Sequence, residues 1–339
     1  MVSTFALSIE PGIAPAASVA RDRALLATPP ARGTGALRVH AFAGDVLALG
    51  RWHRRPTGND VTLHRRLTGG RVVAAGDGFV GLSLVLPHRA ALVAEDWRAL
   101  APDQVMNRCV RGVLEGLKRL GVAAFYPGRD LITVERRPLG MVSFEVADGE
   151  AMLFEVVLSV ARDMSVLPHL LDRADPTGVV TAPVLRPDDV TSLVRLLGAA
   201  PEVGEIARAI AAGCRIAFGV DIVPAPAAPL PRVLGSEWLD SRTPRADLPR
   251  HARVATMLGC LEAHVRLAGD GRLAAVQLAG DVIASSGTIL GLERALVGCP
   301  ATPGAVHQAV TQVLAAPERF VLGVDAPAVI TDVVVQAAS

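Results

Sequence analysis

Lysine is almost absent from this chain of 339 residues: Lys118 is the only one, although lysine and arginine together number 34. The positive charge is therefore carried by arginine, whose planar guanidinium group matches the geometry of phosphate and carboxylate oxygens. Positive and negative side chains nearly balance, with a formal net charge of +1. This balance excludes the strongly basic footprint of a nucleic-acid-binding protein.

Long apolar runs are also absent. The stretch 153–160 is interrupted by Glu155, and no segment of the sequence is apolar for long enough to span a bilayer. The first 13 residues carry no basic residue ahead of an apolar stretch, so they do not resemble a secretory signal. We therefore expect a cytoplasmic protein without a membrane partner.

The cysteines and histidines lack the spacing of a metal site or a disulfide scaffold. No two cysteines form a Cys-x-x-Cys pair: they are Cys109, Cys214, Cys260 and Cys299. Widely spaced cysteines of this kind are expected as small apolar residues inside helices and strands. The histidines at 53, 64, 88 and 169 also show no metal-ligand spacing. We therefore predict no metal site built from protein side chains.

The pattern of apolar residues predicts a sheet-rich first part of the chain. Strands are expected at 37–49, 61–64, 71–75, 79–86, 131–135, 141–146 and 152–158. Helices are expected at 18–26, 190–197 and 202–218, and a further helix opens at Pro102. Lys118 lies off the apolar stripe of that last helix, so we expect it to face solvent.

A second folded unit is predicted near the C-terminus. The Pro/Ala-rich stretch 224–231 is typical of a semi-rigid linker. After it, two strands at 261–267 and 272–278 flank the turn Gly269-Asp270-Gly271, and helices follow at 289–296, 305–314 and 328–335. This predicts a small module of two strands and three helices. We therefore expect domains at 1–223 and 251–339, joined by a linker at 224–250.

The segment best suited to holding an anionic group is Arg65-Arg66-Leu67-Thr68-Gly69-Gly70-Arg71. Gly69 and Gly70 would let backbone N–H groups approach a ligand closely, and the guanidinium forks of Arg66 and Arg71 match phosphate oxygens in pairs. The alternative interpretation is a strained turn between two strands with solvated arginines.

This segment is similar to the Arg-Arg-x-Ser/Thr-Gly-Gly-Gly turn of the lipoate-protein ligase A family, in the biotin/lipoate protein ligase superfamily. Other stretches resemble the family in the same order over residues 35–335: Leu47-Ala48-Leu49-Gly50-Arg51, Gly128-Arg129-Asp130-Leu131, Arg137-Pro138-Leu139-Gly140, Ser236-Glu237-Trp238, Thr243-Pro244, Gly280-Asp281 and Leu292-Glu293-Arg294-Ala295-Leu296. The resemblance implies an α/β protein with a large mixed-sheet, ligase-like catalytic domain followed by a small α/β accessory domain.

The resemblance also implies an activity: lipoate or a related medium-chain acid is activated by ATP, with Mg²⁺, to acyl-AMP. The acyl group then passes to a lysine of a lipoyl-carrier domain. The residues that match the family's adenylate contacts are Arg66, Gly69, Gly70, Arg71, Val72, Val73, Ala74, Asp77 and Gly140. The catalytic role falls to Arg137, which stands where the family has a lysine.

Three departures separate this chain from the family pattern. Arg137 replaces a compact ammonium group with a wider fork. Ala75-Gly76 stands where the family has His-Asp, with Asp77 beside it, and Glu150-Ala151-Met152 replaces a His-Gly-Thr stretch, which predicts a reshaped acyl pocket. One alternative is therefore a degenerate relative that binds an acyl-adenylate or carrier domain without chemistry. Another is a transferase that uses Cys109 as nucleophile, although its position inside a predicted helix favours a core role.

Overall fold

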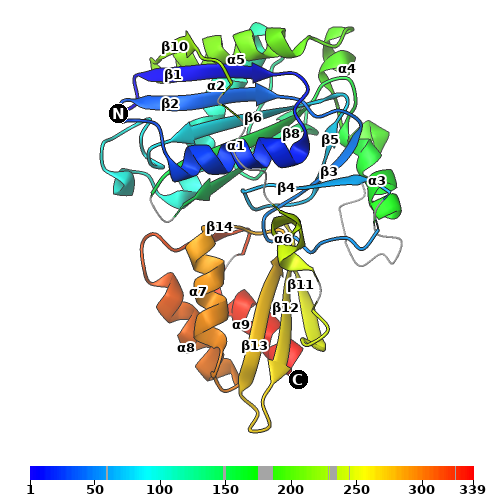
Figure 1. The fold of residues 1–339 in the computed structure, drawn as a ribbon, viewed down its shortest axis with the longest axis vertical. Coiled ribbons are helices and arrows are strands. Elements are labelled where there is room, and N and C mark those ends of the chain that lie inside the picture. The colour runs from blue at the N-terminus through cyan, green and yellow to red at the C-terminus, as the bar shows by residue number, and fades with distance from the viewer. Residues whose placement is uncertain are drawn as a thin grey trace.

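The computed structural model describes residues 1–58, 60–147, 150–174, 186–227, 229, 235–243, 245–324 and 326–339. A large body built on a seven-stranded sheet sits above a smaller body that contains the C-terminus (Figure 1). The predicted linker at 224–250 and the pair Thr243-Pro244 lie partly outside the described residues.

The large sheet is mixed, with strand order β10-β1-β2-β6-β9-β8-β7. β1 runs parallel to β10 and β2, and the remaining neighbours are antiparallel. The strands are β1 (Thr4–Glu10), β2 (Thr34–His40), β6 (Phe79–Leu86), β7 (Leu131–Val134), β8 (Arg137–Val146), β9 (Met152–Ser159) and β10 (Asp221–Pro224). Every residue of β9 is buried, as expected of a strand covered on both faces.

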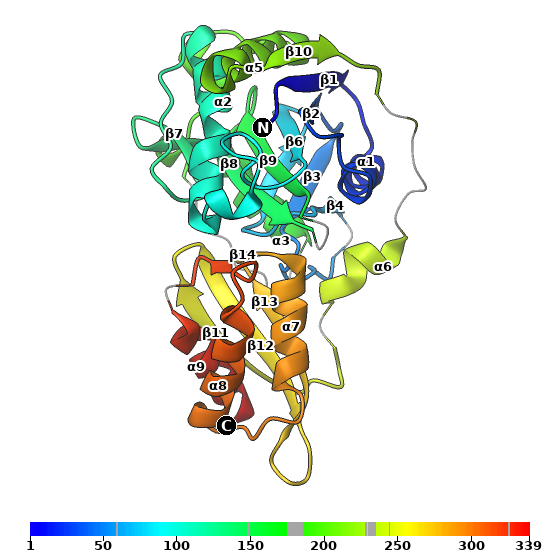
Figure 2. The ribbon, with the colours of Figure 1, turned by 90° about the vertical axis from the view of Figure 1, so that its left-hand side faces the viewer.

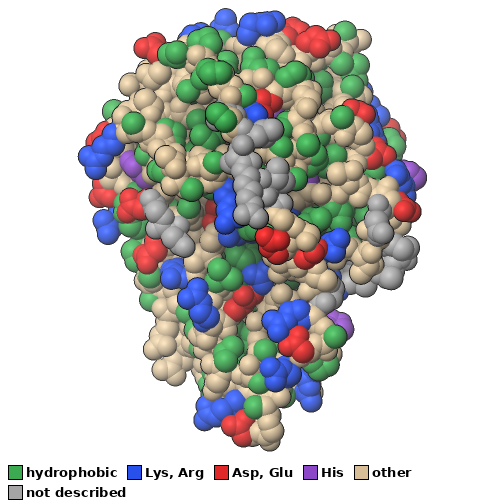
Figure 3. All heavy atoms as spheres, viewed as in Figure 1, with side chains coloured by type: hydrophobic (Ala, Val, Ile, Leu, Met, Phe, Trp, Pro, Cys, Tyr) green, Lys and Arg blue, Asp and Glu red, His purple; other side chains and the backbone are tan. Residues whose placement is uncertain are grey.

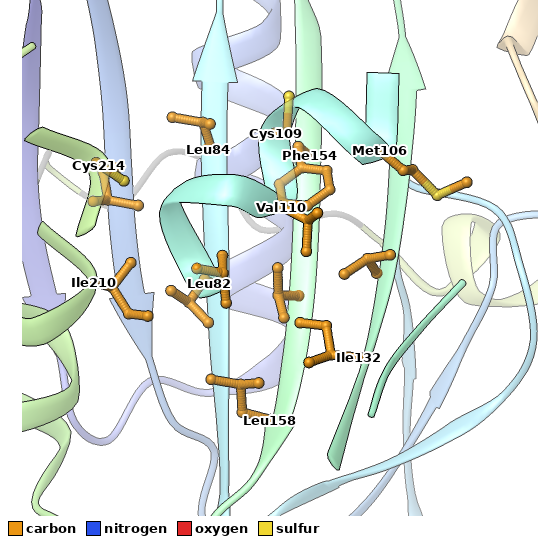
Figure 4. Packing of buried hydrophobic residues seen from close by; sticks show 14 of the residues in the cluster. Leu82, Leu84, Met106, Cys109, Val110, Ile132, Phe154, Leu158, Ile210 and Cys214 are labelled. Atoms are coloured by element: carbon orange, nitrogen blue, oxygen red, sulfur yellow. The ribbon is translucent and has the colours of Figure 1, made fainter. Parts of the chain in front are cut away.

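Two helices cover one face of this sheet, α2 (Val105–Arg119) and α5 (Val203–Phe218) (Figure 2). Their apolar residues pack against β6, β7 and β9 (Figure 4), with Met106, Cys109 and Val110 from α2 and Ile210 and Cys214 from α5. Lys118 exposes 74% of its side chain on the opposite side of α2. The solvent-facing position predicted for Lys118 and the core positions predicted for Cys109 and Cys214 are therefore confirmed.

The other face carries α1 (Pro15–Ala27) and a small three-stranded sheet of order β4-β3-β5. Its strands are β3 (Asp45–Leu49), β4 (Thr62–Arg65) and β5 (Val73–Gly76), and α3 (Leu167–Ala174) packs beside them. The single strand expected at 37–49 is wrong. It is two strands in two sheets, because Gly44, with φ of +72°, turns the chain just before β3. A short helix, α4 (Leu193–Leu197), precedes α5.

The C-terminal body has a three-stranded antiparallel sheet of order β11-β12-β13. Its elements are β11 (Arg250–Thr256), β12 (Gly259–Leu267), β13 (Leu273–Gly280), α7 (Ser286–Leu296), α8 (Pro303–Leu314) and α9 (Pro327–Ala338). The predicted module of two strands is therefore wrong by one strand. The sequence pattern did not predict β11 because Arg250, His251 and Arg253 make this strand polar and largely exposed.

A short strand, β14 (Ile283–Ala284), pairs with β15 (Val321–Leu322) and lies where the two bodies meet (Figures 1 and 2). Ile283 is fully buried and belongs to the same hydrophobic cluster as the core of the large body. The helix α6 (Ser236–Leu239) also lies at this junction. The domain division at residues 223 and 251 stays a prediction.

Positive and negative side chains are interspersed over the face in Figure 3, in keeping with the near-neutral net charge. Among the described helices, none combines the length and the hydropathy needed to span a membrane.

Candidate functional site

The glycine bend, residues 65–71, connects β4 to the approach to β5. Its backbone is fixed by the strand end beside it, since the N–H of Arg51 donates to the carbonyl oxygen of Thr68 at 2.8 Å. A Cβ atom on Gly50 would lie 1.9 Å from the carbonyl oxygen of Gly70. Only glycine therefore permits this approach, which gives a physical reason for the Leu-Gly-Arg strand end that precedes the bend.

Arg66 lies inside the bend and is 2% exposed. Its Nη2 donates to the carbonyl oxygens of Gly69 at 3.1 Å and Arg71 at 2.8 Å, so the guanidinium group ties the two sides of the bend together. Burial lowers the pKa of Arg66 to about 10, while the nearby carboxylates of Glu155 and Asp130 act in the opposite direction. The group therefore stays charged at neutral pH.

Arg71 is the last residue of the bend, and its guanidinium group binds a carboxylate group. Its Nε and Nη2 donate to the two oxygens of Asp130 at 2.6 and 2.9 Å, and the Asp130 side chain is fully buried. This is the bidentate geometry in which arginine binds carboxylates most strongly. Asp130 belongs to the Gly-Arg-Asp-Leu stretch that resembles the family.

Arg65, the first arginine of the motif, has a structural role. Its guanidinium donates to four backbone carbonyl oxygens, those of Gly50, Arg51, His53 and Leu239. The indole Nε1 of Trp238 in turn donates to the carbonyl oxygen of Arg65 at 2.9 Å. Arg65 therefore holds the strand end and α6 together through Nε and Nη1.

Polar side chains of the large sheet form hydrogen bonds with the bend. Thr68 donates through Oγ1 to Glu155 on β9, and Ser143 on β8 donates through Oγ to the carbonyl oxygen of Gly69 at 3.0 Å. Ser143 and Glu155 are direct cross-strand neighbours. Burial raises the pKa of Glu155 to about 7, and the carboxylate of Asp22 adds to this effect. The family motif assigned no role to Ser143 or Glu155; the one signal was a charged residue inside an apolar stretch.

The C-terminal body covers the bend from the other side. The N–H of Gly70, a residue in the left-handed region with φ of +84°, donates to the carbonyl oxygen of Val282 at 2.8 Å. A Cβ atom on Gly69 would lie 2.2 Å from the same oxygen. Glu145 on β8 accepts a hydrogen bond from the N–H of Ser286, at the start of α7, at 2.9 Å. The Val282–Ile283 backbone therefore occupies the space next to the donors that the sequence assigns to an anion.

One cavity lies within the large body, and another lies at the junction of the two bodies. A small cavity of about 20 Å³ lies beside Arg66, between the small sheet and the large sheet. A larger one, about 410 Å³, is lined by Arg89, Trp97 and Arg319 among others and contains none of the residues predicted to contact the adenylate.

The remaining predicted contacts are spread along the strands. Val72, Val73 and Ala74 are buried in the core between the small sheet and α3. Gly140 lies within β8, where a Cβ atom would stand 2.7 Å from the carbonyl oxygen of Val157. Asp77 is exposed at the far end of β5 from the bend, and its N–H donates to the carbonyl oxygen of Gly44.

Arg137 begins β8, six residues before Ser143. Its Nη2 lies 2.8 Å from a carboxylate oxygen of Glu135, and 40% of its side chain is exposed. The structure thus groups Arg66, Gly69, Gly70 and Arg71 at the bend and places Arg137 at a strand end. The roles assigned to all of these residues stay predictions.

Other reactive groups are poorly placed for chemistry. Burial raises the pKa of Cys109 to about 12, so its thiol is protonated at neutral pH. Among the described residues, no three His, Cys, Asp or Glu side chains gather as metal ligands.

Comparison with known families and structures places these features in context. Residues 54–215 match the model of the lipoyl protein ligase A/B catalytic domain, a range that includes the whole bend. The sequence finds no match among curated proteins.

Several solved structures share the fold. P. falciparum LipL1 in complex with lipoate is 12% identical, with a TM-score of 0.65, and the alignment covers 92% of this chain and 94% of that one. A lipoate-protein ligase A bound with ATP is 16% identical, with a TM-score of 0.52 over 71% of this chain and 92% of that one. A bi-partite lipoate protein ligase from Thermoplasma acidophilum, described with its E2 lipoyl domain, gives 16% and 0.52 over 71% and 90%. At these identities the likeness establishes the fold.

Proposed function

We propose that this chain, whose residues 54–215 match the lipoyl protein ligase A/B catalytic domain, is a lipoate-protein ligase of the biotin/lipoate ligase superfamily and uses ATP to attach lipoate or a related medium-chain acid to a lysine of a carrier domain. In the first step, a carboxylate oxygen of the acid attacks the α-phosphorus of ATP, forming acyl-AMP and releasing pyrophosphate. In the second, the lysine amine attacks the acyl carbon, forming an amide and releasing AMP and a proton.

The observation that carries this proposal is the glycine bend with its buried arginine. Both steps concentrate negative charge on oxygens around one phosphorus, and fixed N–H groups and cations in a dry site stabilise such charge strongly. The N–H of Gly70 already donates to a carbonyl oxygen, so the same donor can hold a phosphate oxygen once Val282 moves away. Arg66 holds the bend in shape from within and supplies positive charge at the same point.

The relatives of known structure support the substrates. One of them is bound with ATP, another holds lipoate, and a third is described with an E2 lipoyl domain. The described residues of this chain hold no cluster of three metal ligands. Mg²⁺ is therefore proposed only as an ion that arrives with the nucleotide phosphates, which is its usual mode of binding in such sites.

We propose that residues 1–223 form the catalytic domain, that 224–250 act as a linker and that 251–339 form an accessory domain. The accessory domain covers the bend through Val282 and Ile283. Binding of the nucleotide then requires this segment to separate from Gly69 and Gly70.

The test is adenylation followed by transfer. Purified protein with lipoate, ATP and magnesium should exchange pyrophosphate into ATP and should add a lipoyl mass to a carrier domain. If Arg137 does the electrostatic work of the family lysine, Arg137→Ala should lower the exchange rate by about 100-fold, the cost of removing one oriented contact to a developing charge. Arg137→Lys is the matched control and should retain most of the activity. Absence of both exchange and mass shift with every carrier tested would contradict the proposal.

The second candidate is a relative that binds an acyl-adenylate or a carrier domain without chemistry. Two observations favour it: the bend is covered by the Val282–Ile283 backbone, and Arg137 pairs with Glu135 at a strand end. Calorimetry with a non-hydrolysable lipoyl-adenylate distinguishes the two. Tight binding without pyrophosphate exchange supports the binder, whereas any exchange excludes it.

A further inference from the structure

The cavity of about 410 Å³ at the junction is built by both bodies of the molecule. Its lining comes from the segment between β6 and α2, from the end of β8, from the start of α7 and from the segment between α8 and β15. The volume lies within the range of small-molecule sites. The bend is not part of this lining, so the proposed function leaves the cavity without a role.

Arg89, on the large body, is a buried cation in the wall of this cavity. It is 4% exposed, and its Nε donates to the carbonyl oxygen of Leu100 at 2.7 Å. Within the described part of the chain, its Nη1 and Nη2 have no hydrogen-bond partner, neither atom is fully enclosed, and the group forms no ion pair. Arginine is almost never fully buried unless it is paired. The position of Arg89 therefore indicates that the cavity takes up an anion.

A tryptophan fixes the position of this guanidinium group. The Cζ atoms of Arg89 and Arg98 lie 4.3 and 4.6 Å from the centroid of the Trp97 ring. Each arginine gains a cation–π contact, but the ring also holds two like charges close together. Burial lowers the pKa of Arg89, and the charge of Arg98 adds to this effect. The exposed carboxylates of Glu150 and Glu318, which also line the cavity, act in the opposite direction without forming an ion pair with Arg89.

The C-terminal body adds a second cation and the start of a helix. Arg319 is half-buried, its Nη1 donates to the carbonyl oxygen of Gly287, and it forms no ion pair among the described residues. α7 begins at the junction, directly after β14 (Figure 2), and its N-cap Ser285 also lines the cavity. The N-terminal end of a helix carries partial positive charge. The two bodies therefore present positive charge to one cavity, and an anion between them would neutralise it.

We propose that the junction cavity binds a small phosphate monoester, held by Arg89 from the large body and Arg319 from the C-terminal body, and that this ligand keeps the C-terminal body on the bend. A phosphate monoester carries a charge of about −2 at neutral pH and three strong acceptor oxygens. It therefore matches two guanidinium groups, each of which pairs best with two oxygens. The cavity is larger than a phosphate group, so room remains for the organic part of the ester.

The regulatory part of this inference rests on the proposed function. The bend is covered by Val282 in the same arrangement that forms the cavity. A ligand that contacts both bodies favours this arrangement and thus opposes binding of an adenylate at the bend. By linkage, the adenylate weakens binding of the ester by the same factor. The cavity would then be an inhibitory site.

The binding site is tested by calorimetry with ribose 5-phosphate on the full chain at constant ionic strength. We expect one saturable site per chain and no binding of ribose. Arg89→Gln and Arg319→Gln should each weaken binding by about tenfold or more, the usual effect of losing a hydrogen bond to a charged group. Arg111→Gln, at an exposed position on α2, is the matched control and should leave the affinity unchanged.

Several results would overturn the site. These are the absence of saturable binding, or an affinity that neither Arg89→Gln nor Arg319→Gln reduces. Succinate carries a similar charge without phosphorus, and equal or tighter binding of succinate would overturn the assignment to a phosphate. Should Arg89→Gln fail to fold, Arg319→Gln, at a half-buried position in the other body, is sufficient.

The inhibitory role is tested by competition. Saturating ribose 5-phosphate should weaken binding of a non-hydrolysable lipoyl-adenylate several-fold in the wild type, and this effect should disappear in Arg319→Gln. Unchanged adenylate affinity with the ester bound would overturn the inhibitory role while the proposed function stands. If no adenylate binds under any condition, the proposed function fails and the inhibitory role falls with it, whereas the titration with ribose 5-phosphate still decides the binding site.

Discussion

The backbone N–H of Gly70 donates a hydrogen bond to the carbonyl oxygen of Val282 at 2.8 Å, across 212 positions of sequence. One partner belongs to the bend that the sequence assigns to an anion, and the other immediately precedes β14 in the C-terminal body. A carbonyl oxygen carries partial negative charge, so Val282 here meets the donor that a phosphate oxygen would use. If the bend binds a nucleotide as proposed, this covering and nucleotide binding are mutually exclusive.

Gly69→Ala should weaken the docking of the C-terminal body. The new Cβ would lie 2.2 Å from the carbonyl oxygen of Val282, and backbone rather than a flexible side chain would have to move. We expect a loss of about 1–3 kcal/mol in the free energy of unfolding, the usual cost of overpacking, measured by urea denaturation. Gly304→Ala, with nothing within 4 Å of its Cβ, is the control. Equal stability of the two variants would show that the bend and the Val282 segment are not in firm contact.

Ile283→Ala should lower the stability of the protein and raise its affinity for the adenylate. Ile283 is fully buried, and its truncation should cost about 2–5 kcal/mol in the free energy of unfolding. If the bend is the adenylate site, as proposed, loosening this segment should also tighten binding of a non-hydrolysable lipoyl-adenylate several-fold, as measured by calorimetry. Ile330→Ala, in the C-terminal core, is the same substitution away from the bend. It should reduce stability without changing affinity; unchanged affinity in both variants would argue against the covering role.

Glu155→Gln should change how stability depends on pH. Burial raises the pKa of Glu155 to about 7 from an ordinary value near 4.5, so the folded state binds more protons than the unfolded state between these values. The contribution of Glu155 is fully present below about pH 4.5 and is lost as the pH rises through about 7. Relative to Glu155→Gln, the wild type should thus lose stability from pH 4.5 to pH 8.

Urea unfolding at several pH values measures this difference directly. Glu115→Gln, on the solvent side of α2, serves as the control and should keep the wild-type slope. Parallel curves for the wild type and Glu155→Gln would mean that the Glu155 carboxyl titrates like an ordinary one.

Arg71→Lys should cost stability although it preserves the charge. The fork of Arg71 makes two hydrogen bonds to the fully buried Asp130, at 2.6 and 2.9 Å, and an ammonium group cannot reproduce both. The expected loss is about 1–3 kcal/mol, that of a buried hydrogen bond to a charged group. Arg137→Lys, at a pair that is 40% and 77% exposed, should stay within about 0.5 kcal/mol of the wild type. A smaller loss at Arg71 than at Arg137 would contradict the assignment of Asp130 as its partner.

Cys109→Ser should leave any acyl transfer intact. Its thiol is buried among the residues of α2, α5 and the large sheet, and burial raises its pKa to about 12, so it is not a thiolate at neutral pH. The substitution buries a hydroxyl group and should cost about 1–3 kcal/mol in stability, whereas Cys299→Ser at a half-buried site should cost less. If acyl transfer disappears in Cys109→Ser but persists in Cys299→Ser, the result would support a transferase that uses Cys109 as its nucleophile.

Much of the fold follows from local patterns. β6 spans the predicted 79–86, and the ends of α7 and α8 match the predicted 296 and 314, because side-chain period and turn residues are encoded within short stretches of chain. β1 and β11 were missed. Buried, half-buried and exposed residues are mixed along β1, so it shows no clear alternation. In β11, the polar and exposed residues obscure the alternation expected of a strand.

The sequence by itself determined the bend, since Arg66, Gly69, Gly70 and Arg71 are contiguous and a contiguous motif is readable without knowing the fold. Only the tertiary structure decided what surrounds it: Glu155 and Ser143 on the large sheet, Val282 in the C-terminal body, and the small cavity that Arg66 and His40 line. The hydrogen bonds among them join residues 74 to 212 positions apart. Such separations leave no local periodicity to read, because they depend on which faces of two sheets and a C-terminal segment come together.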